Sequence, residues 1–89
     1  MTDGPVYRVL FSKRALKDIE KLTPKLRNKL KDIVRNRLVT EPQGGKYLVG
    51  NLRGYLSIRL THRDRIVYRI DENEKTVLIA RARSHYDLK

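Results

Sequence analysis

The sequence predicts an α+β domain in the order β-α-α-β-β-β-β, with the N-terminal strand and a helical hairpin packed on one face of a mostly antiparallel, twisted sheet. Three observations support this prediction. A short alternating segment comes first, two amphipathic segments with helix-start signals follow, and four short segments rich in β-forming residues occupy the second half. Helices and strands that occur in separate runs are typical of α+β folds.

The first half of the chain carries one strand and two helices. Tyr7–Phe11 alternates between apolar and polar residues and is rich in β-formers. Ser12 is a predicted N-cap, and the apolar residues that follow it recur at helical spacing. Thr23 followed by Pro24 starts a second helix, whose apolar stripe runs to Leu38. We therefore expect an antiparallel pair of helices.

The second half is expected to form a meander of short strands. Gly and Pro residues break the helical pattern at Thr40–Gly45. The strands predicted after this loop are Lys46–Val49, Tyr55–Thr61, Arg65–Ile70 and Thr76–Arg83.

The register of the central hairpin follows from its apolar residues. A loop at His62–Asp64 would place apolar residues opposite one another, because opposed residues of an antiparallel pair point to the same side. The expected pairs are Leu60 with Ile66, Ile58 with Tyr68 and Leu56 with Ile70. In the last strand we expect Leu78, Ala80 and Ala82 to face the helices.

This register collects basic side chains on the other face of the sheet. The residues expected there are Ser57, Arg59, Thr61, Arg65, Val67 and Arg69, with Val77, Ile79, Arg81 and Arg83 of the last strand. One arginine on a solvated face is ordinary. Several on one face repel one another, and the acidic residues Asp71, Glu72 and Glu74 lie out in a turn. We therefore expect an anionic ligand on this face.

Composition supports a polyanionic partner. The chain of 89 residues has the size of a single domain, over residues 1–89, and carries a net charge of +11. Such a charge favours nucleic acid, although an acidic protein inhibitor would use the same attraction. No helix combines a basic face with an aromatic apolar face, so a membrane surface is not expected.

Other classes of protein are excluded by what the sequence lacks. Without cysteine there is no disulfide framework or thiolate metal site, and His62 and His85 lack metal-ligand spacing. We therefore expect no metal and no cofactor. The start resembles no signal peptide, and no apolar run reaches the roughly 20 residues that span a bilayer. A soluble, cytoplasmic protein is expected.

The arginines and the end of the chain suit RNA cleavage without a metal. Attack by a 2′-OH needs a base, positive charge for the dianionic phosphorane, and an acid for the 5′-leaving oxygen. Arg59 and Arg65 could supply the charge and His85 the acid, because histidine titrates near neutrality. Tyr86 could stack on a base or hold a phosphate.

The two histidines are interpreted differently. A single histidine is more commonly structural or solvent-exposed than catalytic, and His62, in the hairpin loop, is expected to be exposed surface. His85 follows Arg81 and Arg83 at the end of the last predicted strand, which favours a role at the site.

The chain resembles the RelE/ParE toxin superfamily and, within it, the YoeB branch. The similarity covers nearly the whole chain, and its motif comprises Leu48, Asn51-Leu52, Gly54-Tyr55, Ser57, Arg59, Arg65-Ile66-Val67-Tyr68 and His85-Tyr86. The resemblance implies a RelE-like fold and a toxin of a type II toxin–antitoxin system. It also implies a toxin that enters the ribosomal A site and cuts mRNA there without a metal.

The same resemblance implies roles for individual residues. Arg65 matches the arginine that stabilises the scissile phosphate, Arg59 a supporting arginine, His85 the general acid and Tyr86 the terminal aromatic residue. Arg81 and Arg83 resemble the basic residues that the RelE branch uses in the same strand, and Lys46 is expected to contact phosphate.

Two features depart from the YoeB pattern. YoeB-like members have a glutamate, proposed as general base, where this chain has Lys46. Either Lys46 acts as lysines do in RelE-type sites, or Glu41 in the preceding loop reaches the site. The tail Asp87–Lys89 extends past the His-Tyr pair.

The expected partners follow from the charge and the resemblance. They are mRNA, the ribosome, and an acidic cognate antitoxin that covers the arginine face. Operator DNA would be bound only by the toxin–antitoxin complex, and a homodimer or a hetero-oligomer are both open. The basic hairpin would hold ribosomal RNA through Lys13, Arg14, Lys17, Lys21, Lys25, Lys29 and Lys31.

Two other functions are open from the sequence. A ParE-like toxin would poison DNA gyrase by binding, although it needs no general acid such as His85. A basic RNA-binding module without toxicity would share the charge but not the chemistry.

Overall fold

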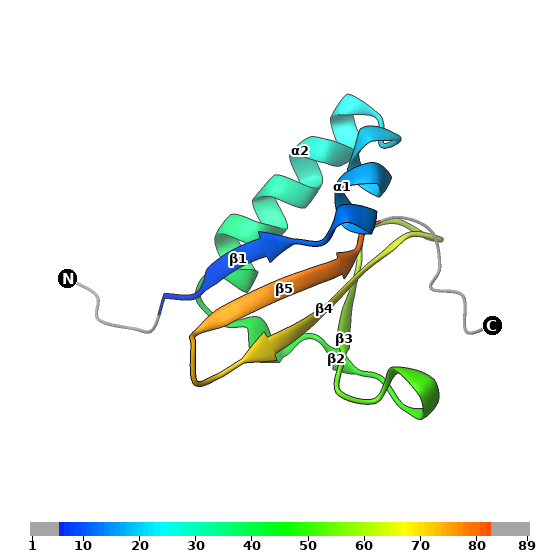
Figure 1. Ribbon diagram of the computed structural model, residues 1–89. Coiled ribbons are helices and arrows are strands. Elements are labelled where there is room, and N and C mark those ends of the chain that lie inside the picture. Colours follow the sequence, from blue (N-terminus) through cyan, green and yellow to red (C-terminus); the bar gives the residue numbers. More distant parts are fainter. Residues whose placement is uncertain (1–5, 83–89) are drawn as a thin grey trace.

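The computed structural model describes residues 6–82, in which one layer is a sheet and the other a pair of helices (Figure 1). Along the chain, the elements are β1 (Arg8–Phe11), α1 (Lys13–Glu20), α2 (Pro24–Ile33), β2 (Lys46–Tyr47), β3 (Leu56–Arg59), β4 (Arg65–Asp71) and β5 (Thr76–Arg81). The sheet order is β1-β5-β4-β3-β2. The predicted α+β class and order of elements are confirmed.

The N-terminal strand belongs to the sheet itself. β1 lies at one edge and runs parallel to β5, whereas the other strand pairs are antiparallel. Phe11 is opposite Ile79, and the amide of Ser12 donates to the carbonyl of Ile79 at 2.9 Å. The parallel pair therefore fixes the start of α1 against the end of β5, close to the candidate site.

Both predicted helix starts are confirmed. Ser12 Oγ accepts a hydrogen bond from the amide of Ala15, and Thr23 Oγ1 accepts one from Leu26. The second helix differs from the prediction at its end. Val34–Leu38 forms a π-helical turn, in which the amide of Val39 donates to the carbonyl of Val34 at 3.0 Å. A π turn adds one residue to the helical repeat and therefore shifts the face that the residues after it present.

The core lies between the helices and one face of the sheet. Its buried members include Leu22, Leu30, Leu38, Leu56, Ile58, Ile66, Tyr68, Val77 and Ile79. Tyr68 is fully buried, and its hydroxyl donates to the carbonyl of Pro42 at 2.6 Å. Gly45 packs against this hydroxyl so closely that a Cβ atom there would collide with it. The loop before β2 is thereby held to the centre of the sheet.

The register of the β3–β4 hairpin was predicted two residues away from its actual position. Ile58 is opposite Ile66, and Leu56 is opposite Tyr68. The reason lies in the loop, where Leu60 and Thr61 both donate to the carbonyl of Asp64. This turn removes Leu60 from the pairing and leaves Arg59 opposite Arg65. A shift of two preserves the side on which each residue points, so the predicted faces of β3 and β4 are correct.

The predicted faces of β5 were wrong for its first part. Val77 and Ile79 face the core and are fully buried, whereas Leu78 and Ala80 line a pocket on the opposite face. A bulge explains the difference. Tyr68 is opposite Ile79 but Val67 is opposite Arg81, so that Ala80 is the extra residue. A bulge reverses the side on which the following residues point. The prediction, which assumed strict alternation, is therefore wrong for Val77–Ala80 before the bulge and correct for Arg81 after it.

Candidate functional site on the open face of the sheet

The open face is the side of the sheet turned away from the helices. Cross-strand pairing places Lys46 opposite Ser57, Ser57 opposite Val67, and Val67 opposite Arg81. Opposed residues in antiparallel strands point to the same side, so this row crosses four strands on one face. Four of the predicted site residues thus come together on the open face: Lys46, Arg59, Arg65 and Arg81.

Arg59 and Arg65 form the adjacent row. They are direct cross-strand partners at the end of β3 and the start of β4. Arg59 is exposed, and Arg65 is partly buried. Two like charges directly opposite one another destabilise a sheet. The arrangement therefore presents concentrated positive charge at a position where an anion would relieve the repulsion.

Arg81 is held by an acidic residue that the sequence analysis missed. Asp18 on α1 accepts hydrogen bonds from Arg81 Nε at 2.8 Å and Nη2 at 3.3 Å, and from the amide of Ala82 at 3.1 Å. Asp18 is buried, and the side chain of Arg81 is 31% exposed. A signal was present in the sequence. Asp18 is three residues after Ala15 and four before Leu22, which places it on the apolar face of α1.

Ser57 lies at the centre of the open face, between Lys46 and Val67. It is 2% exposed, and its hydroxyl has no hydrogen-bond partner among the described residues. A buried hydroxyl without a partner costs free energy, and each such group in a native protein needs an explanation. The sequence pattern placed Ser57 on this face correctly but indicated no role for it, and nothing in the sequence pointed to its burial.

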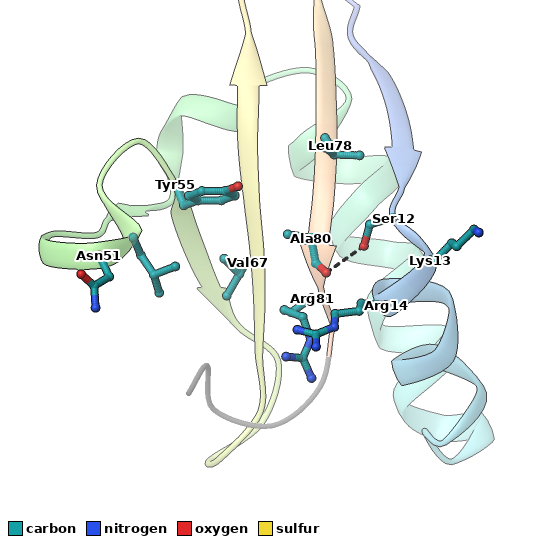
Figure 2. A pocket seen from close by; sticks show the side chains of 10 residues that line it. Ser12, Lys13, Arg14, Asn51, Tyr55, Val67, Leu78, Ala80 and Arg81 are labelled. Atoms are coloured by element: carbon teal, nitrogen blue, oxygen red, sulfur yellow. Dashed lines mark hydrogen bonds between the residues drawn. The ribbon is translucent and has the colours of Figure 1, made fainter. Parts of the chain in front are cut away.

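A pocket of about 610 Å³ opens beside this row, between the start of α1 and the segment Asn51–Tyr55 (Figure 2). Val67, Leu78 and Ala80 lie across its middle, Arg14 and Arg81 at one side, and Tyr55 at the other (Figure 2). Ser12 Oγ donates to the carbonyl of Ala80 at 2.8 Å, which ties the start of α1 to the bulge in β5.

Tyr55 forms the aromatic wall of this pocket. Its ring is partly buried, and the guanidinium carbon of Arg69 lies 5.9 Å from the ring centroid. A cation at this distance is weakly attracted to the ring. Arg69 therefore contributes to the open face through its contact with Tyr55 as well as by its charge.

The remaining predicted site residues, Arg83, His85 and Tyr86, lie outside the described residues. His62 is exposed in the β3–β4 loop, as expected. Glu41 is exposed and directly precedes the short helix Pro42–Gly44. Within residues 6–82, no group of acidic, histidine or cysteine side chains is placed to hold a metal ion. Nor does that part of the chain contain a helix long and apolar enough to cross a membrane.

Comparison with known proteins identifies the family. The model of the ParE toxin of the type II toxin–antitoxin system, parDE, matches residues 9–88. The chain belongs to the RelE/ParE superfamily of toxins. The predicted family is thus confirmed, and the protein is a toxin of a type II toxin–antitoxin system. No curated protein sequence matches the chain at a significant level.

Solved structures of RelE/ParE proteins share this fold. The RelBE2 toxin–antitoxin complex of Mycobacterium tuberculosis contains a chain with a TM-score of 0.82 and 32% identity, covering 98% of this chain and 100% of that one. A YoeB/ParE toxin of Agrobacterium tumefaciens has a TM-score of 0.79 and 26% identity, with coverages of 89% and 99%. The YoeB–YefM complex of Staphylococcus aureus contains a chain with a TM-score of 0.64 and 32% identity, covering 90% of this chain and 98% of that one.

Proposed function

We propose that this RelE/ParE toxin is an endoribonuclease that cuts mRNA in the ribosomal A site without a metal. The observation that carries the proposal is the direct opposition of Arg59 and Arg65 on the open face, in one cluster with Lys46 and Arg81. Preorganised positive charge, aimed at the position where negative charge develops, is the largest contribution that such a site can make.

The reaction would be attack of the 2′-oxygen on the adjacent phosphorus. The O2′–P bond forms and the P–O5′ bond breaks, which leaves a 2′,3′-cyclic phosphate and a 5′-hydroxyl. The phosphorane between these states carries two negative charges. Arg65 would contact its non-bridging oxygens, and Arg59, the cross-strand partner of Arg65, would support it.

Two proton transfers complete the reaction. His85, three residues after Ala82 in the sequence, would protonate the departing 5′-oxygen, and Tyr86 would stack on a base. The base that takes the 2′ proton would be Lys46 or Glu41. Pairing with Ser57 puts Lys46 in the row beside Arg59 and Arg65, which favours Lys46 as the residue near the phosphate.

The antitoxin is the second proposed partner. The solved relatives include a RelBE2 complex and a YoeB–YefM complex, each formed by a toxin with its antitoxin. An acidic antitoxin segment would cover the arginines of the open face here, because opposite charges steer and select partners.

A ParE-like gyrase poison is the second candidate function. The observation that favours it is the family match itself, since the matching model is that of the ParE toxin and covers residues 9–88. Such a toxin would act by binding gyrase, and its activity would not depend on charge stabilisation of a phosphorane.

The two functions are separated by assaying one preparation in two reactions. In cell-free translation the wild-type protein should stop synthesis and truncate the mRNA, whereas Arg65→Ala should do neither. In a supercoiling assay with purified gyrase the wild-type protein should have no effect. Inhibition of supercoiling with intact mRNA would contradict the nuclease and support the gyrase poison.

A further inference from the structure

The pocket beside the arginine row has the properties of a site for a flat ring joined to a negatively charged group. Its volume of about 610 Å³ lies within the range of small-molecule pockets. Arg59 and Arg65 do not line it, but Val67 and Arg81 of the neighbouring row do, so the pocket adjoins the two arginines proposed to contact the cleaved phosphate without including them. The question is which ligand its lining would select.

The middle of the pocket is apolar and one wall is aromatic. Val67, Leu78 and Ala80 supply the apolar surface, and the ring of Tyr55 faces it from the side of the Asn51–Leu52 segment (Figure 2). Arg69 contacts the ring, as described above. An aromatic ring beside an apolar surface is the arrangement on which nucleic-acid bases stack.

The opposite rim carries positive charge at the start of α1, where such charge lowers the stability of the helix. The first turn of α1 contains Lys13 and Arg14 and no acidic residue. Positive charge at a helix N-terminus is unfavourable, because the macrodipole is also positive there. Arg14 lies at the pocket with Arg81, whose guanidinium group is oriented by Asp18. A bound phosphate would relieve the conflict at the helix start and would meet two guanidinium groups.

We propose that this pocket is a subsite for one nucleotide of single-stranded RNA. The base packs between Tyr55 and the apolar surface of β4 and β5, and its phosphate lies at Arg14 and Arg81. The inference rests on the proposed function, since it takes RNA to be the ligand of the open face. It adds that a nucleotide neighbouring the cleaved one is held by stacking, which tolerates every base.

The test separates stacking from charge. Binding of a short, fluorescently labelled 2′-O-methyl oligoadenylate, which cannot be cleaved, is compared with binding of an abasic oligomer of the same length and charge. The wild-type protein should bind the base-containing oligomer about ten-fold more tightly. Tyr55→Leu, which keeps apolar bulk but removes the ring, should reduce this ratio to about two-fold. Tyr55→Phe should retain it.

The matched aromatic control is Tyr47→Ala. Tyr47 is exposed and opposite Leu56, so that it lies on the helix side of the sheet and away from the pocket. This variant should keep the wild-type ratio. To test charge, Arg14→Gln should weaken the binding of both oligomers equally. It should also lower the slope of the logarithm of affinity against the logarithm of salt concentration by about 0.7, the value for one phosphate contact with a single strand. Arg35→Gln, which removes an exposed charge of the helical layer, should change binding less.

Each outcome decides the inference. A wild-type ratio near one, or a ratio unchanged in Tyr55→Leu, would overturn the subsite. Cleavage on ribosomes that depends on Arg65 would still support the proposed function in that case. Conversely, a ratio that depends on Tyr55, in a protein that leaves mRNA intact on ribosomes, would support the subsite and overturn the nuclease.

Discussion

Asp18 Oδ2 accepts a hydrogen bond from Arg81 Nε at 2.8 Å, across 63 positions of the sequence. The same oxygen also accepts from the amide of Ala82, the last residue described. Asp18 thus joins α1 to the end of β5 at the edge of the pocket. One carboxylate orients a guanidinium group of the open face and holds the backbone from which the sequence continues to His85.

Replacing Asp18 should reduce stability measurably. Asp18→Ala leaves a partly buried guanidinium group and a buried amide without this acceptor, and we expect a loss of about 2 kcal/mol after allowing for the exposure of Arg81. Asp18→Asn keeps one acceptor oxygen and should lose about half as much. Urea unfolding measures both, with Asp32→Ala, an exposed acid on α2, as control. Equal stability of Asp18→Ala and the control would refute the structural role of the pair.

Gly45 should tolerate no side chain. A Cβ atom would collide with the hydroxyl of Tyr68 and press on the carbonyl of Ser57. Relief requires moving a buried ring that is hydrogen-bonded to Pro42, so Gly45→Ala should destabilise the protein by about 2–3 kcal/mol. Gly44→Ala is the matched control, because its nearest neighbour is the end of the Arg37 side chain. Thermal unfolding should show a large shift for Gly45→Ala alone, and similar shifts for the two variants would contradict this account.

Tyr68 should make stability depend on alkaline pH. Burial raises the pKa of Tyr68 from 10.0 to about 12, despite the opposing effect of the Arg37 charge. Because the folded-state pKa lies above the unfolded value, the stabilisation is complete below about pH 10 and is lost towards about pH 12, at about 1.4 kcal/mol per unit. Tyr68→Phe has no phenol to titrate and therefore lacks this pH-dependent stabilisation. The stability advantage of the wild type over Tyr68→Phe, measured by urea unfolding, should therefore shrink over this pH range. A constant difference would argue against a buried, neutral phenol.

Removing the hydroxyl of Ser57 should cost nothing in stability. The group is buried and has no hydrogen-bond partner among residues 6–82. Leaving such a group unsatisfied costs about 1–3 kcal/mol, so Ser57→Ala should equal or exceed the wild type in stability by up to about 1 kcal/mol. Chemical denaturation tests this directly. A loss greater than about 1 kcal/mol would show that the hydroxyl has a structural partner.

Much of the fold could be predicted from local pattern. The two N-caps and the alternation in β3 and β4 each depend on neighbouring residues, and both are confirmed. The pairing of Arg59 with Arg65 was close to the prediction, because the register error of two residues left the faces unchanged. A turn closed by hydrogen bonds to the carbonyl of Asp64 caused that error, and such a turn has no periodic signature.

Contacts between distant segments could not be predicted in the same way. The bulge at Ala80 arises because β5 must present Val77 and Ile79 to the core and still place Arg81 opposite Val67. The parallel pairing of β1 with β5 brings Ser12 to the bulge, and the Asp18–Arg81 pair follows from it. The bulge, the contact of Ser12 with it and the Asp18–Arg81 pair all depend on how the sheet is assembled. The sequence offered a hint only for Asp18, an acid on an otherwise apolar helix face.

The proposed cleavage depends most on Arg65, which would stabilise the transition state. The direct test is to map 5′ ends on a defined mRNA whose codon occupies the A site of purified ribosomes, with wild type, Arg65→Ala and the charge-matched control Arg35→Ala. We expect cleavage within that codon, at equal rates for wild type and control, and at least about 100-fold slower for Arg65→Ala. Uncut mRNA with the wild-type protein, or equal cleavage by Arg65→Ala, would contradict the proposed function.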